Sequence, residues 1–238
     1  MKTIVMLPGM MCDERLFSPQ ITHLEGRYLV KTMSIHEQAK MGDLAQNVLE
    51  KSPDKFALLG LSMGGILAME IMRQAPERIT HLALLDTNPR AELDAVKQRR
   101  GPQIDKVRNG GLSQIMRDEM KPNYLVDSPN KLDILNLCMV MAEDLGDQAF
   151  INQSIALRDR PDYQTALKGV DIPTLIMCGR EDILCPIERH EQMHELITGS
   201  TLHIVDKAGH LPTLEQPEIV NRALDQWLNE QMLENETR

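Results

Sequence analysis

The feature of this sequence that most constrains its fold is a tight glycine–serine–glycine turn between an apolar run and a helical pattern. The turn is Gly60-Leu61-Ser62-Met63-Gly64, which follows the continuous apolar run Phe56–Leu61. A serine at such a turn projects its hydroxyl above the edge of a sheet, and the strand and helix then approach too closely for side chains at the glycines. The pattern predicts a nucleophile elbow with Ser62 as the nucleophile. A glycine-rich turn whose serine only caps the helix is the alternative.

Short apolar runs alternate with longer helical patterns along most of the chain. Strands are expected at residues 3–7, 28–32, 56–61, 81–86, 173–179 and 201–205. Helices are expected at residues 41–49, 64–75, 187–197 and 217–233. This alternation predicts an α/β fold, in which a mostly parallel sheet of about six strands is flanked by helices.

The alternation fails between Asn88 and about Gln164. This stretch has helical patterns without a clear strand, and it has turn signals at Gly101-Pro102, Gly110-Gly111 and Ser128-Pro129. It is too long for a simple connection within a compact domain. We therefore expect a core made of residues 1–88 and 165–238, with residues 89–164 inserted as a helical unit.

A serine hydroxyl becomes a strong nucleophile when a neighbouring base removes its proton. After a nucleophile elbow, the acid and then the histidine follow in the chain. His210 comes after the last expected strand, and Asp182 comes after the strand before it. Such loops at the ends of strands carry the chemistry of open α/β sheets. Asp182 would orient His210, with Glu181 and Asp86 as the alternative acids.

An oxyanion formed at Ser62 needs two hydrogen-bond donors. The first is the backbone N–H of Met63. The second is expected in the loop after the first strand, at Met10 or else at Met11. These methionines and Leu61 also predict an apolar pocket wall, although packing in the core is the alternative role for some of them.

A competing motif lies further along the chain. His190-Glu191-Gln192-Met193-His194 fits the pattern H-E-x-x-H on an expected helix, where two histidines on one face bind zinc. Glu215 is the nearest third ligand at a plausible spacing, but an expected strand separates it from the motif. The apolar positions of the helix leave the motif on a face that should be exposed to solvent. We therefore expect no metal site.

Charge and cysteine content limit the partners and the compartment. A net charge of −9 argues against nucleic acid as the main partner. The cysteines have the spacing of neither a zinc ribbon nor a disulfide framework, so reduced thiols and a cytoplasmic location are expected. No stretch is apolar enough to predict a membrane-spanning helix, so no membrane association is expected. The cysteines are Cys12, Cys138, Cys178 and Cys185.

Residues 97–117 carry six positive charges and one negative charge in a chain that is acidic as a whole. A solvated helix face is the simpler interpretation. Attraction of a carboxylated substrate or of an acidic carrier protein is the alternative. The basic residues are Lys97, Arg99, Arg100, Lys106, Arg108 and Arg117.

Four motifs together resemble the α/β-hydrolase superfamily. They are Leu7-Pro8-Gly9-Met10, Gly60 to Gly65, Gly179-x-x-Asp182-x-x-x-Pro186, and Gly209-His210-Leu211 followed by Glu215-Gln216-Pro217. The last is similar to that of enol-lactonases and haloperoxidase-like esterases. The resemblance implies a helical cap at residues 89–164 and acyl transfer to water through an acyl-enzyme, without a cofactor. Two features depart from the family: the initial antiparallel hairpin is missing, and Pro8 replaces the usual histidine.

The expected function is therefore that of a serine hydrolase (carboxylesterase) with a small-molecule ester substrate, which includes thioesters and lactones. The same three residues also serve carbon–carbon bond hydrolysis, lyase and acyltransferase chemistry in related folds. A non-catalytic binding protein is a further alternative. The presence of Ser62, Asp182 and His210 together argues against it.

Overall fold

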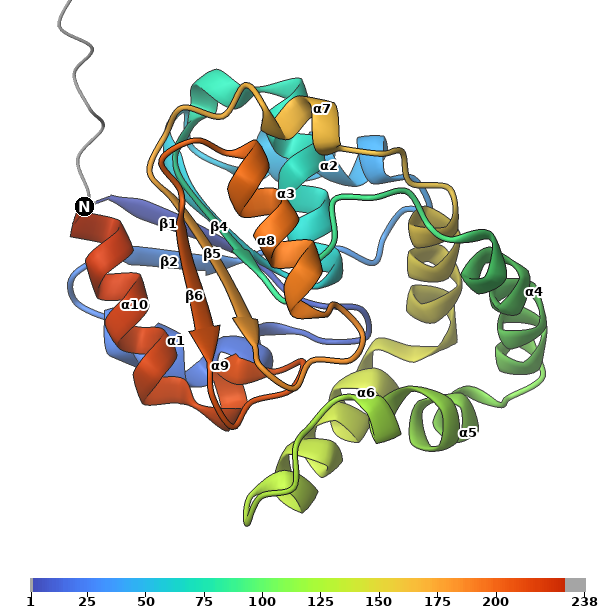
Figure 1. Cartoon of the computed structure of the whole chain (residues 1–238). Coiled ribbons are helices and arrows are strands. Elements are labelled where there is room, and N and C mark those ends of the chain that lie inside the picture. Colours follow the sequence, from blue (N-terminus) through green and yellow to red (C-terminus); the bar gives the residue numbers. More distant parts are fainter. Residues whose placement is uncertain (1, 230–238) are drawn as a thin grey trace, which may run out of the picture.

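Six strands form one sheet at the centre of the structure, a computed structural model that describes residues 2–229 (Figure 1). The strand order is β2-β1-β3-β4-β5-β6, and every neighbouring pair is parallel. The expected parallel sheet of about six strands is thus confirmed. The strands are β1 Thr3–Leu7, β2 Leu29–Thr32, β3 Phe56–Leu61, β4 Ile79–Leu85, β5 Thr174–Gly179 and β6 Thr201–Val205.

Helices connect the strands and cover both faces of the sheet (Figure 1). The α-helices are α1 Ser18–Leu24, α2 Met41–Lys51, α3 Met63–Gln74, α4 Asp94–Arg108, α5 Leu112–Ile115, α6 Lys131–Arg158, α7 Gln164–Leu167, α8 Ile187–Leu196, α9 Pro212–Glu215 and α10 Pro217–Asn229. Short turns of helix are η1 Glu14–Phe17, η2 Pro76–Arg78, η3 Met116–Met120 and η4 Lys121–Asn123. The last helix was expected to reach residue 233, and residues 230–233 lie outside the described residues.

Two apolar cores pack against the sheet because successive side chains of a strand point to opposite faces. In β1, Ile4 and Met6 face the core that contains α1 and α10. Val5 and Leu7 face the core that contains α2, α3 and α8. Strand β3 is buried at every position, as a continuous apolar run between two helical layers requires.

The connection between β4 and β5 contains no strand among its residues, all of which the structure describes. We refer to residues 89–164 of this connection as the helical insert. Its ends lie side by side, because Tyr163 N–H donates to the Pro89 carbonyl over 2.8 Å. Helices α4, α5 and α6 lie together to one side of the sheet (Figure 1). Gly146 interrupts α6 with φ 78° and ψ −178°, so two helices meet there at a kink.

One expected turn is wrong and another is confirmed. Helix α4 runs through Gly101-Pro102 without a break. Proline removes one backbone hydrogen bond from a helix, but Ile104 and Val107 of the same helix are buried in the core, which favours the helix continuing past the proline. The Gly110 turn is present, with a φ of 81° that favours glycine.

Replacing Gly64 by alanine should strongly destabilise the protein. A Cβ atom at Gly64 would lie 1.9 Å from the Leu7 carbonyl oxygen, so α3 and β1 would have to separate. We expect the Gly64→Ala free energy of unfolding to fall by at least about 2 kcal/mol in urea titrations followed by circular dichroism.

Gly101→Ala is the matched control for Gly64→Ala. A Cβ atom at Gly101 would meet nothing within 4 Å, and the residue lies inside α4. Alanine in a helix interior is favoured over glycine by about 0.5–1 kcal/mol, so this variant should be slightly more stable than the parent. Similar free-energy changes for the two variants would contradict the close approach at Gly64.

Candidate active site

Ser62 occupies a strained turn between β3 and α3. Its φ of 56° and ψ of −115° are unusual for a residue with a side chain. Two hydrogen bonds hold this conformation. Ser62 N–H donates to the Leu85 carbonyl over 2.9 Å, and Thr87 Oγ1 donates to the Ser62 carbonyl over 2.7 Å. Both partners come from β4 and the residues after it, so the neighbouring strand fixes the turn.

The glycines of the turn are there because the backbones almost touch. A Cβ atom at Gly60 would lie 2.2 Å from the Gly64 carbonyl oxygen. A Cβ atom at Gly65 would lie 2.6 Å from Thr87 Oγ1, the atom that holds Ser62. The sequence motif therefore matches a real steric requirement at each of these glycines.

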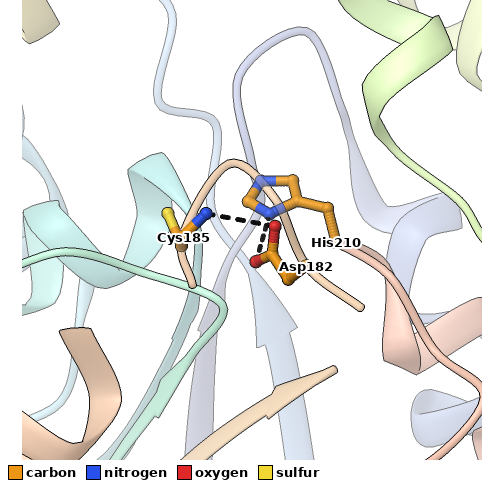
Figure 2. Close-up of side chains that lie close together, drawn as sticks. All are labelled: Asp182, Cys185 and His210. Atoms are coloured by element: carbon orange, nitrogen blue, oxygen red, sulfur yellow. Dashed lines mark hydrogen bonds and ion pairs between the residues drawn. The ribbon is translucent and has the colours of Figure 1, made fainter. Parts of the chain in front are cut away.

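His210 and Asp182 lie next to Ser62 in one hydrogen-bonded series. His210 Nε2 is 2.9 Å from Ser62 Oγ, and His210 Nδ1 is 2.8 Å from Asp182 Oδ2. Figure 2 shows Asp182 below the histidine ring, with Cys185 beside it. Asp182 is in the loop after β5 and His210 is in the loop after β6. This arrangement can transfer a proton from the serine hydroxyl to the ring while the carboxylate fixes the tautomer.

Asp182 is held as a carboxylate. Its other oxygen, Oδ1, accepts the backbone N–H groups of Leu184 and Cys185 over 2.8 and 3.1 Å. Burial alone would raise the pKa of Asp182, but the charge and hydrogen bond of His210 and these two N–H groups lower it below its usual value. A negative charge is therefore stable at the position that faces the imidazole.

The loop that carries His210 is fixed from both sides. Glu215 Oε2 accepts the N–H groups of Gly209 and Leu211, which flank the histidine, over 2.9 and 3.2 Å. His210 N–H donates to the Tyr124 carbonyl over 2.6 Å. Sequence reasoning considered Glu215 only as a zinc ligand and as part of a family motif. It missed Tyr124, which no local pattern marks.

Neither alternative acid contacts the His210 ring. Asp86 is fully buried and accepts the Gly179 N–H over 2.9 Å. Burial, followed by the charge of Asp182, raises the pKa of Asp86 well above its usual value, which disfavours a second negative charge beside Asp182. Glu181 accepts the Ala208 N–H over 3.1 Å. Both side chains hydrogen-bond to the backbone near the site, whereas Asp182 is the acid that contacts the His210 ring.

The loop after β1 carries the two candidate oxyanion donors, and one of them already has a hydrogen-bond acceptor within the protein. Met11 N–H donates to Gln153 Oε1 over 2.9 Å, and Gln153 Nε2 donates to the Ile35 carbonyl. No partner among the described residues engages the Met10 N–H. Met11 is thus engaged by Gln153, which leaves Met10 as the candidate donor in this loop, alongside the Met63 N–H at the start of α3. Gln153 lies on α6 and is another contact that the sequence did not signal.

A cavity of about 380 Å³ opens at Ser62 and His210. Met10, Leu61 and Met63 line it, as expected for an apolar wall, whereas Met11 is buried outside it. The helical insert supplies part of the lining. A cavity of this size accommodates a small organic substrate.

The H-E-x-x-H motif is placed differently from the expectation. His190 is fully buried, not exposed: its Nε2 accepts the Thr87 N–H over 3.0 Å and its Nδ1 lies 3.3 Å from the Pro186 carbonyl. These two partners make burial of a polar ring possible. His194 Nδ1 lies 2.8 Å from Ser200 Oγ. The two histidines share no group of metal-ligating side chains among residues 2–229.

Within residues 2–229, the group of side chains close enough to share a metal ion is Asp182, Cys185 and His210, with ligand atoms within 4.8 Å of one another (Figure 2). Their chemistry does not suit a metal. Both Asp182 oxygens and the His210 Nδ1 are already hydrogen-bonded. Burial raises the pKa of Cys185 well above its usual value, which disfavours a thiolate at this position. The residues present fit proton transfer better than metal binding.

Most of the basic residues at 97–117 pair with acids, as a solvated helix face would. The pairs are Lys97–Asp94, Lys106–Glu119, Arg108–Asp105 and Arg117–Asp118, with separations of 3.8, 3.5, 3.2 and 2.6 Å. Such exposed pairs contribute little to stability, but they cancel much of the local positive field. Arg100 differs, because its acidic partner is buried with it.

Comparison with known proteins gives the family context. The model of the alpha/beta hydrolase family matches residues 33–223. A pimeloyl-[acyl-carrier protein] methyl ester esterase of Aliivibrio salmonicida is 25% identical over 236 residues, which cover 90% of this chain and 87% of that protein. A Bacillus subtilis protein, provisionally named 2-succinyl-6-hydroxy-2,4-cyclohexadiene-1-carboxylate synthase, is 25% identical over 79% of this chain and 71% of its own.

Solved structures agree on the fold. A thermophilic esterase of Thermogutta terrifontis, solved with malate bound, superposes with a TM-score of 0.87 at 27% identity and covers 96% of this chain and 89% of its own. The enol-lactonase of Burkholderia xenovorans LB400 superposes with a TM-score of 0.87 at 18% identity, over 96% and 92% of the two chains. In the part of the chain that the structure describes, no helix is both long and apolar enough to cross a membrane.

The burial of His190 should make folding stability depend on pH. Burial lowers the pKa of His190 to about 4; the Asp182 charge and the Pro186 carbonyl oppose this effect, and His210 adds to it. Between about 6.5 and 4 the unfolded chain binds a proton that the folded chain does not, so stability is lost as the pH falls. From pH 7 to pH 5 this one group should lower the free energy of unfolding by about 2 kcal/mol.

His190→Gln supplies the control for this pH dependence. Glutamine keeps an acceptor for the Thr87 N–H but does not titrate. In urea titrations at pH 7 and pH 5, the parent should lose about 2 kcal/mol more than the variant. Equal losses in the two proteins would show that another group governs the acid sensitivity.

Proposed function

The chain belongs to the alpha/beta hydrolase family, and from this premise we propose that it hydrolyses small carboxylic esters through an acyl-enzyme. One observation carries the proposal: the hydrogen-bonded series Ser62, His210 and Asp182 opens onto the cavity at its serine end. The relatives named esterases, at 25% and 27% identity, support an activity on ester bonds. We extend the proposal to thioesters and lactones, whose carbonyl groups react in the same way.

In the first step, Ser62 Oγ attacks the carbonyl carbon of the ester while His210 Nε2 takes the hydroxyl proton. The Asp182 carboxylate stabilises the imidazolium that forms. The carbonyl oxygen becomes negative and accepts hydrogen bonds from the Met63 and Met10 N–H groups. The helix dipole of α3 favours this charge, because its N-terminus begins at Met63.

In the second step, the carbon–oxygen bond to the alcohol breaks and the alcohol leaves with the proton that His210 returns. The product is an ester between Ser62 and the acyl group. Water then attacks this acyl-enzyme, again with His210 as base. The carboxylic acid leaves and the serine regains its proton.

The helical insert acts in this proposal as a cap that completes the substrate cavity above the core of residues 1–88 and 165–238. Leu157 and Arg160 near its end line the cavity together with Ser62. We propose a small-molecule substrate rather than one that is delivered by a docked carrier protein. The ion pairs across the basic stretch argue for this choice, although the Aliivibrio relative is named for an acyl-carrier protein ester. The free cysteines support a cytoplasmic location.

A fluorophosphonate probe tests the nucleophile. We expect a single adduct, mapped by mass spectrometry to Ser62. We also expect Ser62→Ala to lose both the adduct and at least about 10³-fold of kcat/KM for p-nitrophenyl acetate. Activity should be insensitive to a chelator, which separates this mechanism from a zinc site at His190 and His194. An intact protein without adduct or turnover would contradict the proposal and favour a binding role.

The choice of acid is tested by a matched pair of variants. Asp182→Asn removes the charge that stabilises the imidazolium, so kcat should fall by about 10³- to 10⁴-fold. Asp86→Asn changes a carboxyl that accepts the Gly179 N–H rather than facing the His210 ring, so its kcat should fall far less. Both are measured on the same ester at pH 7.5, and circular dichroism checks the fold. A larger loss for Asp86→Asn would reassign the acid.

The same residues also suit carbon–carbon hydrolysis, lyase and acyltransferase chemistry. Acyltransfer is distinguished by adding an alcohol such as methanol and measuring how much of the acyl group forms a new ester. Hydrolysis predicts that the free acid dominates in water, at a rate that depends on Ser62. A dominant new ester at low alcohol concentration would move the proposal to acyl transfer.

A further inference from the structure

The cavity beside Ser62 is lined by three arginines and one acidic residue. Arg99 and Arg100 lie on α4, Arg160 follows α6, and Glu92 precedes α4. Glu92 is the one carboxylate among the described residues that line this cavity. The wall formed by the helical insert therefore carries more positive than negative charge.

Glu92 divides its two oxygens between two arginines, of which Arg160 is buried and Arg100 is largely buried. Its Oε2 accepts Arg100 Nε over 2.6 Å, and its Oε1 accepts Arg160 Nη1 over 2.8 Å. The side chains of Arg100, Arg160 and Glu92 are only 12%, 5% and 7% exposed. Two cations thus share one anion where water is largely excluded, and an unpaired charge is costly in such a place. Burial lowers the pKa of Arg100; Glu92 opposes this effect, and Arg160 and Arg99 add to it.

Arg100 uses Nε and Nη2 to contact Glu92, and its third guanidinium nitrogen, Nη1, points toward Met10 in the loop after β1. Arg100 Nη1 lies 3.9 Å from Met10 Sδ, and a thioether is a weak acceptor. Gly9, next to Met10, packs against the nucleophile, since a Cβ atom there would lie 3.6 Å from Ser62 Cβ. A charged donor without a strong acceptor therefore faces the same cavity as the serine.

We propose that Arg100, backed by Arg160, binds a carboxylate on the acyl part of the substrate, so that the preferred substrates are monoesters of dicarboxylic acids. This inference rests on the proposed function, because it names the substrates of the same site. A carboxylate matches the planar donors of a guanidinium and supplies the missing negative charge. Met63, Ile66 and Leu157 give the same cavity apolar walls that suit a methylene chain between the two ends.

The first experiment compares matched esters. Monomethyl esters of linear dicarboxylic acids from succinate to suberate are paired with methyl esters of monocarboxylic acids of the same length, and acid release is followed by pH-stat. For the parent, we expect kcat/KM to be at least about tenfold higher for the best anionic ester than for its neutral counterpart. Arg100→Met should lower kcat/KM for the anionic ester by at least about tenfold and remove most of that preference.

Arg108→Met is the matched control for Arg100→Met. Arg108 lies on the same helix and loses the same charge, but its side chain is 58% exposed and does not line the cavity. Its anionic-to-neutral ratio of kcat/KM should stay within about twofold of the parent. An equal loss in both variants would show a general electrostatic effect and overturn the proposal.

Binding is measured separately from turnover, on the Ser62→Ala protein by calorimetry. The best monomethyl ester should bind to the Ser62→Ala protein. Adding Arg100→Met to that protein should raise the dissociation constant of the ester at least about tenfold. If Arg100→Met does not fold, competition decides: glutarate or adipate should inhibit the parent's hydrolysis of a neutral ester far better than the uncharged pentanamide does. Equal inhibition by the diacids and the neutral amide would overturn the proposal.

The two proposals fail in different ways. If Ser62→Ala abolishes hydrolysis of both esters but the parent shows no preference for the anionic one, the carboxylate site is wrong and the esterase stands. If the anionic ester binds through Arg100 but its turnover survives in Ser62→Ala, the carboxylate site stands and the serine mechanism is wrong.

Discussion

The candidate site depends first on the near contact of three backbone segments around Ser62. Gly60 and Gly64 leave no room for a Cβ atom between β1, β3 and the start of α3. This close approach forces Ser62 to a φ of 56°, a conformation that persists only when its surroundings over-determine it. Leu85 and Thr87 supply that support from the neighbouring strand. The position of the serine hydroxyl is therefore a property of the whole sheet rather than of one turn.

The parallel sheet then brings the partners of Ser62 to the same edge, since the carboxyl ends of all six strands meet there. Each partner is fixed by hydrogen bonds to backbone groups. Asp182 accepts two N–H groups of its own loop, and Glu215 holds the two residues beside His210. The Tyr124 carbonyl adds a support from the helical insert. The insert thus contributes to the geometry of the histidine as well as to the cavity wall.

Sequence reasoning succeeded where the signal is local. Short stretches of sequence mark the elbow, the strands and the loops that follow them. The proximity of Ser62, Asp182 and His210 could therefore be predicted. It failed where a contact joins distant segments: nothing near Gln153 or Tyr124 indicates that they hold Met11 and His210. It also misplaced His190, because a polar pattern on a helix favours an exposed face unless other groups satisfy the ring. The Pro186 carbonyl, one turn before His190, and the Thr87 N–H, which is distant in the chain, do satisfy it, and the Thr87 contact is not visible from the motif.

The charges of α4 also show that a sequence does not reveal which residues pair in space. Counting charges along residues 97–117 gives a strongly basic stretch, but pairing in space removes most of that field at the surface. Arg100 behaves differently, because its side chain is largely buried, so water screens its charge less, and because its partner Glu92 is shared with Arg160. This largely buried charge, which shares its acidic partner, is the basis of the proposed carboxylate site. Helix α4 belongs to the same insert that, through Gln153, holds Met11 in the loop after β1. The proposed carboxylate site and the proposed oxyanion donors would therefore depend on the same packed unit.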